Sequence, residues 1–223
     1  EGIFNHLTLR VPGHKDRYYQ IPFGTHWSEV TASCFMEVDY DGEVVAGEGI
    51  VERSAYCIHA PMHKTMDHAN AVFHTHMPYA SALTRLEDQK IQPIGQTELG
   101  TMMKTGYDDS YDGPGLDPAE GARLAKACGK NTVMLMANHG ALTLGRNVAE
   151  AYDRLYYLER VAQVPLYAMW TGRPLRELPA PIVEKTYNTY RGSAMKYGGR
   201  SNAEWHFDAL KRILDRKEPD YAH

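Results

Sequence analysis

Two short apolar runs, each ending in histidine, constrain the fold of this chain most. The first reads NAVFHTH at residues 70–76, and the second reads TVMLMANHG at residues 132–140. Short continuous apolar runs bounded by turn residues are typical of buried strands. We therefore expect two interior strands of a sheet, each of which brings histidine side chains to its end.

Helical patterns surround these two runs. Residues 52–66 should form a helix, because Ile58, Met62 and Met66 recur at four-residue spacing. Pro78 fits the first turn of the next helix. Further helices are expected over 118–128, between an N-cap at Asp117 and a stop at Gly129, and over 147–170.

The first third of the chain instead alternates short β-like runs with turns. Asp41 and Gly42 lie between two such runs and predict a hairpin. Strands and helices do not follow a regular βαβ alternation, so the pattern favours a mixed or antiparallel sheet covered by helices on both faces. No linker-like segment appears, and we expect a single domain over 1–223 whose residues 181–223 form a helical tail.

Charge and composition exclude several classes of function. The formal charge is −4 with no basic face, so nucleic acid is not an expected partner. Apolar stretches such as VMLMA are too short to cross a bilayer, so no membrane partner is expected. Cys34, Cys57 and Cys128 are widely spaced and outside any CxxC pattern, which favours a reducing compartment, the cytoplasm.

The histidines at the ends of the two strands suggest a metal site. His74 and His76 are two residues apart, so on a strand both point to the same face. His139 follows the second strand in the same way. Three neutral imidazoles with an open coordination position form a catalytic site for a divalent metal, with Zn²⁺ as the default occupant. The alternative is that these are ordinary strand-end histidines bonded to backbone groups.

Four motifs in order make the chain resemble the class II aldolase/adducin family. FNHLTLRV resembles the family's opening motif, and QIPFGTHWSEVTAS its substrate loop and helix. AVFHTHMPYASAL matches the signature with the paired histidines, and ANHGALTLG matches the later N-H-G motif. The resemblance covers roughly residues 1–170 and is greatest for the adducin-like branch and its bacterial relatives.

This resemblance implies a fold and a metal centre. The family fold is a three-layer α/β/α sandwich with a central mixed, mainly antiparallel sheet. The family usually forms a homotetramer with active sites near subunit interfaces. His74, His76 and His139 occupy the positions of its metal ligands, so we expect one divalent ion per subunit, Zn²⁺ first, with Fe²⁺ or Mn²⁺ as alternatives.

The chain departs from the family where the aldolases carry S-S-E before the paired histidines. Arg53, Ser54 and Ala55 take these three places, so the glutamate that serves as general acid/base is absent. An alanine has no titratable group, and another residue would have to transfer the proton. His59, one helical turn from Ala55, is the first candidate for the base. The other candidates are Tyr107, Tyr111 and Glu98.

The resemblance also indicates how the substrate would be held. Asn5, Gly24 and Ser54 match family positions that grip the substrate phosphate, whereas Phe23 replaces a threonine and Arg53 a serine. Arg53 offers a planar fork suited to a carboxylate. We expect a small anionic substrate, with a shift towards carboxylates that include aromatic ones. The alternative is that Phe23 packs in the core and Arg53 is solvated.

Together these features predict a metal-dependent carbon–carbon lyase of the aldolase or decarboxylase type. It would act on a small hydroxy- or keto-substrate through a metal-stabilised enediolate. Two alternatives stay open: a non-haem iron-dependent oxidative decarboxylase, and a non-catalytic adducin-like assembly module.

Overall fold

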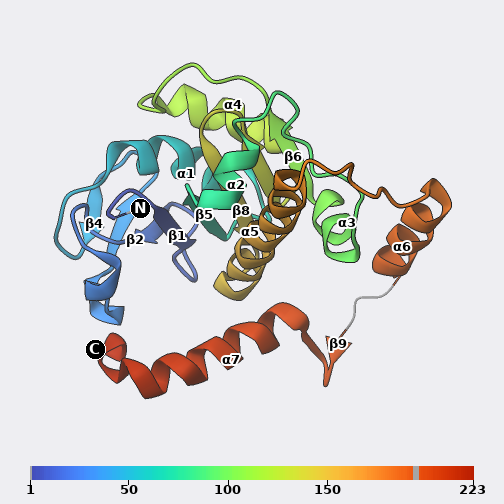
Figure 1. Ribbon diagram of the computed structural model, residues 1–223. Coiled ribbons are helices and arrows are strands. Elements are labelled where there is room, and N and C mark those ends of the chain that lie inside the picture. Colours follow the sequence, from blue (N-terminus) through green and yellow to red (C-terminus); the bar gives the residue numbers. More distant parts are fainter. Residues whose placement is uncertain (1, 193–195) are drawn as a thin grey trace.

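A mixed sheet forms the centre of the computed structural model, which describes residues 2–192 and 196–223. In this part of the chain the sheet has eight strands, ordered β4-β3-β2-β1-β5-β8-β7-β6 (Figure 1). The strands are β1 (His6–Arg10), β2 (Arg17–Gln20), β3 (Met36–Asp39), β4 (Val44–Ala46), β5 (Ala71–Thr75), β6 (Thr105–Asp108), β7 (Val133–Met136) and β8 (Gly140–Gly145). Only β6 and β7 pair in parallel among these. The expected mixed, mainly antiparallel sheet is confirmed.

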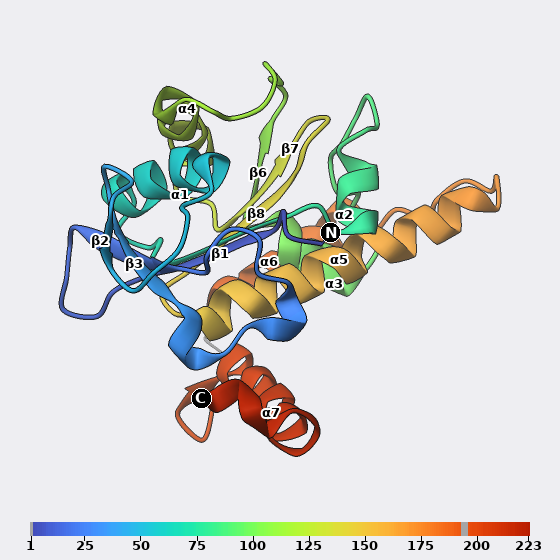
Figure 2. The same ribbon diagram turned by 90° about the vertical axis from the view of Figure 1, so that its left-hand side faces the viewer.

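Helices cover both faces of this sheet (Figure 2). Helices α1 (Arg53–Thr65) and α4 (Pro118–Cys128) cover one face, where Ile58 and Leu124 join a buried cluster with strand residues. The opposite face carries α2 (Pro78–Leu83), α3 (Gln96–Met102) and α5 (Val148–Trp170). There Leu135 of β7 packs with Leu158 of α5. The expected three-layer α/β/α arrangement is therefore confirmed.

Local sequence signals set the helix ends as expected. Helix α1 begins after Glu52, whose carboxylate accepts a hydrogen bond of 2.6 Å from the Ala55 backbone N–H. Helix α4 begins after Asp117 and ends at Gly129, which has a φ of +58°. Strands β3 and β4 form the expected hairpin, with Gly42 at a φ of +89° in its turn.

The C-terminal tail is helical, but it is not continuous. It contains α6 (Ala180–Gly192), a two-stranded hairpin of β9 (Lys196–Tyr197) and β10 (Arg200–Ser201), α7 (Asn202–Lys217) and η3 (Pro219–Ala222). Gly198 and Gly199 take left-handed φ angles of +60° and +80° in the turn, which ordinary residues rarely adopt and which ends helical geometry. Residues 193–195 lie outside the described part. Helix α7 packs along α5, where His206 Nδ1 lies 2.8 Å from Asp153 Oδ1.

Two short 3₁₀ helices, η1 (Trp27–Glu29) and η2 (Ala32–Cys34), connect β2 to β3. The chain returns to η2 at its end, where the Ser33 backbone N–H donates to the His223 carbonyl over 2.9 Å. Across the described residues, no helix combines the length and the apolar character that a membrane crossing requires.

Candidate metal centre

The two histidine-bearing runs lie side by side in the folded chain. His74 is in β5 and His76 follows this strand, while His139 lies in the turn between β7 and β8. Strand β8 pairs with β5, so Leu142 is directly opposite His74. This pairing brings residues that are over sixty positions apart in the sequence to one end of the sheet, as the metal-site hypothesis requires.

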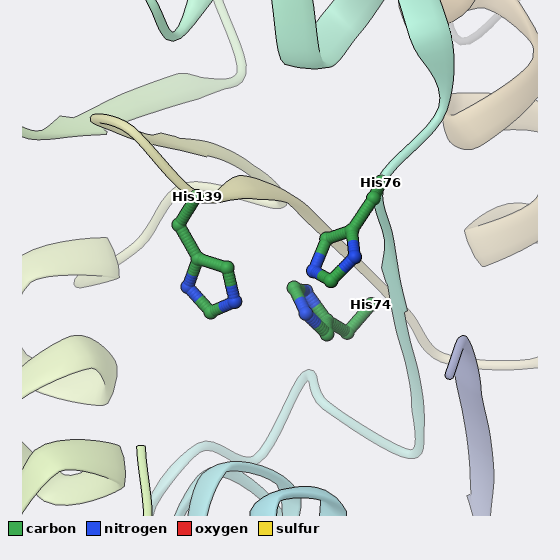
Figure 3. A group of neighbouring side chains, drawn as sticks. All are labelled: His74, His76 and His139. Atoms are coloured by element: carbon green, nitrogen blue, oxygen red, sulfur yellow. The ribbon is translucent and has the colours of Figure 1, made fainter. Parts of the chain in front are cut away.

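The three rings converge on one point (Figure 3). One potential ligand atom from each of His74, His76 and His139 lies within 4.8 Å of the others. Ring centroids are 4.8 Å apart for His74 and His76, 4.8 Å for His74 and His139, and 5.2 Å for His76 and His139. We call these residues the histidine triad. Small rotations of the rings would bring one nitrogen of each within the ~2.0–2.1 Å of a single shared cation.

Gly140 makes this convergence possible through close packing. A Cβ at this position would lie 2.6 Å from His76 Cδ2 and 2.6 Å from the Thr75 carbonyl oxygen. The residue does not have a positive φ, so the glycine is needed for space and not for a tight turn. The left-handed residue of this turn is Asn138, with a φ of +56°.

Hydrogen bonding and burial prepare the triad for a cation. His74 Nδ1 lies 3.1 Å from the Ala141 carbonyl oxygen, which can only accept, so Nδ1 carries the proton and Nε2 remains available as a ligand atom. Burial, reinforced by His139 and His76, lowers the pKa of His74 well below its ordinary value. Burial and the neighbouring His76 lower the pKa of His139 to about 4. Both rings are therefore neutral at pH 7, the state that ligates metals.

Two polar side chains hold the backbone of the triad. The Asn5 side-chain oxygen accepts a hydrogen bond of 3.2 Å from the His76 backbone N–H. The Arg85 guanidinium donates to the His139 carbonyl over 2.7 Å and also to the Ser81 carbonyl at the start of its own helical turn. Asn5 was expected here as a substrate contact. Arg85 was not predicted, since an arginine after a short helix carries no signal of its own.

Behind the triad, Glu52 and His6 occupy the space next to Ala55. His6 is directly opposite His74 in the pairing of β1 with β5, and the two rings stack at 5.9 Å. His6 Nε2 lies 3.2 Å from Glu52 Oε2. Burial alone would raise the pKa of Glu52, but its contacts with His6, the Ala55 N–H and the Ser54 hydroxyl outweigh this and lower it to about 2. Ala55 itself is completely buried.

A second group of histidines lies deeper, and we call it the buried chain: His63, Thr8 and His59. His63 Nδ1 must donate to the Ala69 carbonyl at 2.7 Å, so its Nε2 accepts from the Thr8 hydroxyl at 2.8 Å. The hydroxyl then has no second proton, and His59 Nδ1 donates to it over 2.7 Å. His59 is 0% exposed, and burial holds its pKa well below the ordinary value.

The expected proton-transfer residues lie at different distances from the triad. The Tyr111 ring is 6.1 Å from the His139 ring and borders a small cavity with Asp108 and Glu120. Tyr107 instead faces the α5 side of the sheet, where its hydroxyl accepts from the Ile91 N–H at 3.1 Å. Glu98 is buried in α3, on that same side. Of the three candidates Tyr107, Tyr111 and Glu98, only Tyr111 therefore lies next to the triad.

The expected substrate contacts lie around the N-terminus of α1 and the loop before it. The exposed Arg53 donates through Nε to the Leu116 carbonyl at 3.0 Å, and the Ser54 hydroxyl donates to Glu52. Gly24 has a φ of +93° next to Phe23. The Phe23 ring pairs with Phe4 at 6.2 Å, and both are more than one-third exposed, so Phe23 is not core packing.

Comparison with known proteins gives relatives along the whole chain. A provisional aldolase class 2 protein of Pseudomonas aeruginosa is 29% identical over 98% of this chain and 83% of its own length. Decarboxylase NovR of Streptomyces niveus is 29% identical over 83% of this chain and 68% of its own. A 4-hydroxy-3-prenylphenylpyruvate oxygenase/4-hydroxy-3-prenylbenzoate synthase of Streptomyces roseochromogenus subsp. oscitans is 28% identical over 83% and 67%.

Solved structures and the family model agree with these relatives. The crystal structure of an aldolase II superfamily protein from Pseudomonas syringae is 30% identical, covers 99% of this chain and 87% of its own, and superposes with a TM-score of 0.88. The family model described as the Class II Aldolase and Adducin N-terminal domain matches residues 1–166. The histidine triad lies within this match, and the chain belongs to the class II aldolase and adducin N-terminal domain family.

Proposed function

We propose that this protein is a metal-dependent carbon–carbon lyase, of the aldolase or decarboxylase type, with the histidine triad as its metal ligands. The observation that carries the proposal is the convergence of three imidazoles from two separate chain segments at one end of the sheet. The family is that of class II aldolases, which supports activity of the lyase type in general.

The donor set fits a divalent cation. The His74 and His139 rings are neutral at pH 7, and the His74 tautomer is fixed by the Ala141 carbonyl so that Nε2 is available. Three imidazoles without a carboxylate are typical of catalytic zinc sites and are also compatible with Fe²⁺ or Mn²⁺. A bound divalent ion would supply Lewis acidity towards a carbonyl or hydroxyl oxygen and stabilise enediolate charge.

Tyr111 is our preferred residue for proton transfer in place of the missing glutamate. Its ring faces His139, and half of its surface is exposed, so a substrate can reach it. His59 has no exposed surface, and its Nδ1 is engaged by Thr8. With Nδ1 donating to Thr8, the basic nitrogen of His59 is Nε2, which is buried without a hydrogen-bond partner among the described residues, so a substrate could reach it only after rearrangement of the site. Tyr107 would have to act across the sheet.

The substrate we propose is a small anion with an apolar or aromatic portion. Arg53 uses only Nε in its bond to Leu116, so the two terminal nitrogens of its guanidinium can face a carboxylate. Asn5, Ser54 and Gly24 complete this side of the site. Phe4 and Phe23 present an exposed aromatic pair beside Asn5, which suits a planar substrate better than a sugar phosphate.

An oxidative decarboxylase with non-haem iron is the second candidate. The relative from Streptomyces roseochromogenus subsp. oscitans carries the name of an oxygenase, and the missing glutamate removes the usual acid/base of the aldolases. The same triad could hold Fe²⁺ with open positions. An assay without dioxygen separates the two candidates, because the lyase should keep its turnover and the oxygenase should lose it.

A non-catalytic assembly module is the rival from another class, since the family also includes adducin. Elemental analysis of the purified protein is the decisive first experiment. The lyase proposal expects about one divalent ion per subunit. Hydroxy and keto acids, with and without phosphate, would be screened as substrates. Chelation should abolish the turnover found in this screen, and adding the same metal back should restore it. Turnover in a rigorously metal-free sample would refute the mechanism, and metal far below this ratio would favour the module.

The proposed assembly is a homotetramer in the cytoplasm. Helix α5 ends in apolar side chains that no described part of the chain covers, with Val164 56% exposed and Trp170 78% exposed. Such surface supports subunit contacts. Three cysteines without disulfides support a reducing compartment. Light scattering coupled to size exclusion tests the number of subunits.

A further inference from the structure

A second cavity lies away from the histidine triad. It has a volume of about 580 Å³ and lies between α3, α5, α6 and the start of α7. Its lining includes Lys104, immediately before β6, and Val133, at the beginning of β7, whereas His139 follows the end of β7. Because β6 and β7 run in parallel, the cavity and the triad are at opposite ends of these strands.

Three cationic side chains line this cavity: Lys104, Arg154 and Arg191. The only acidic side chain among the lining residues is Asp153, and its carboxylate is engaged by His206 at 2.8 Å. Glu150, outside the lining, pairs with Arg154 at 3.3 Å, so three cations face two carboxylates and the cavity keeps an excess of one positive charge, although the chain as a whole has a formal charge of −4. A local excess of this sign in an acidic protein is a feature that attracts anions.

The hydrogen-bonding capacity of these cations is largely unused. Arg154 is held in place by the Leu144 carbonyl and by Glu150 Oε2, the latter at 3.3 Å. Neither the Lys104 ammonium nor the Arg191 guanidinium bonds to any residue that the structure describes. Desolvation by the cavity walls and the nearby charge of Arg154 lower the pKa of Lys104, although the residue as a whole remains exposed. An anion placed between them would relieve this repulsion.

The walls that carry these groups are well anchored. The Lys104 carbonyl accepts from the Thr132 and Val133 N–H groups, each at 3.0 Å, so the residue is fixed to the sheet. Helix α6 packs against α3 through Tyr190, whose ring lies over Gly100 and whose hydroxyl donates to the Gln96 carbonyl at 3.3 Å. Figure 1 shows α3 and α6 next to one another at this side of the molecule.

We propose that this cavity binds a small multivalent oxyanion, bearing carboxylate or phosphate groups, as a second site independent of the metal centre. Lys104 and Arg191 would donate charge-assisted hydrogen bonds, and Arg154 would add its field. Tyr157 and Tyr190 would border the remainder of the ligand. The volume lies within the ~300–1,000 Å³ that is usual for small-molecule sites. The proposal does not depend on the reaction at the triad.

Calorimetric titration of the whole chain with citrate and with pyrophosphate, at matched ionic strength, tests this site and distinguishes its two ligand sources. We expect at least one of the two anions to bind. Lys104→Met should raise the Kd of that anion about tenfold or more, because one charge-assisted hydrogen bond is lost. Lys104→Arg should retain most of the affinity. Lys130→Met, an exposed lysine outside the cavity, is the matched control and should leave Kd unchanged.

Arg191→Met provides an independent variant, because this exposed side chain makes no hydrogen bond to any residue that the structure describes, and its loss should also weaken binding several-fold. The proposal is overturned if neither anion binds below ~10 mM. It is also overturned if Lys104→Met and Arg191→Met bind as tightly as the natural chain. Binding that survives both changes but disappears in Arg53→Met would belong to the metal centre and would likewise overturn it.

Discussion

The histidine triad and the buried chain behind it use the same side chain for opposite purposes. In the triad, the rings of His74, His76 and His139 direct nitrogens towards a shared point. In the buried chain, His63 uses both nitrogens and His59 uses one in bonds that end on Thr8 or on the Ala69 carbonyl. Burial lowers the pKa of members of both groups, so low pKa alone does not distinguish a ligand from a structural histidine.

The two groups of histidines differ in the direction of the ring nitrogens that make no hydrogen bond to the protein. His63 has both ring nitrogens bonded within the protein and so stabilises the fold, whereas His74 has Nδ1 fixed by the Ala141 carbonyl and a second nitrogen available to the convergent set. His59 also has a nitrogen without a hydrogen-bond partner among the described residues, but it is not part of that set. Spatial convergence is therefore the more informative criterion. The buried chain should govern stability, and the triad should govern metal binding and turnover.

Removal of a triad member should have the largest effect. His74→Ala takes away one of three ligand nitrogens, and we expect metal affinity and turnover to fall by at least ~100-fold, beyond the range seen for outer-shell changes. Elemental analysis and activity after identical metal loading provide the measurement. His63→Gln, in the buried chain, is the matched control and should retain its metal. Equal metal content in the two variants would contradict the division of roles.

Thr8→Val should show the reverse pattern. The substitution preserves shape but leaves His59 Nδ1 and His63 Nε2 without their partner, and each buried unsatisfied group costs ~1–3 kcal/mol. We expect the free energy of unfolding in urea to fall by about 2–4 kcal/mol, with metal content unchanged.

Thr65→Val is the control for that experiment, since the Thr65 hydroxyl bonds to a helix carbonyl at the exposed surface. Its cost should stay within about 0.5 kcal/mol. If both threonine variants lost the same stability, the buried chain would not have the structural role assigned to it.

The sequence was sufficient for the part of the site that depends on short-range pattern and on the family resemblance. The strand period placed His74 and His76 on one face, and the cap residues Glu52 and Asp117 lie at the expected helix starts. His139 was identified as the third ligand because the second apolar run ends in a histidine, as the first does. The pairing of β5 with β8 is a long-range contact, and nothing in either run alone specifies it.

The parts that could not be predicted depend on orientation across elements. Tyr107 and Tyr111 are four residues apart, yet one faces the α5 side and the other borders the triad, because the chain leaves strand β6 between them. His59 is on the expected face of α1, but Thr8 from β1 meets it there. Arg85 acts on the His139 carbonyl through tertiary packing, for which the local sequence carries no signal.

Arg85→Met should have an intermediate effect that sharpens the comparison. The Arg85 guanidinium orients the backbone of His139 without touching the shared point, so its loss should weaken metal binding about tenfold while all three ligands remain. Competition with a chelator of known affinity measures this. Arg173→Met, an exposed arginine after α5, should leave affinity unchanged. An effect as large as that of His74→Ala would imply collapse of the site and not loss of positioning.

The last effect concerns pH, and it is small within any single pH unit. Burial lowers the pKa of His63 to about 3, against an ordinary value near 6.5, so between these values the unfolded chain binds a proton that the folded chain does not. This contribution to stability is complete above pH ~6.5 and is lost by about 1.4 kcal/mol per pH unit as the pH falls towards 3.

His63→Gln cannot take up that proton, so its free energy of unfolding, measured in urea with chelator present, should fall less steeply over the same range. The gap in stability between the natural chain and this variant should therefore narrow with acidity, whereas His14→Gln, at an exposed position, should keep the steeper slope. Parallel slopes for the natural chain and His63→Gln would show that His63 is not buried in its neutral form, and the distinction between the two histidine groups would lose its electrostatic basis.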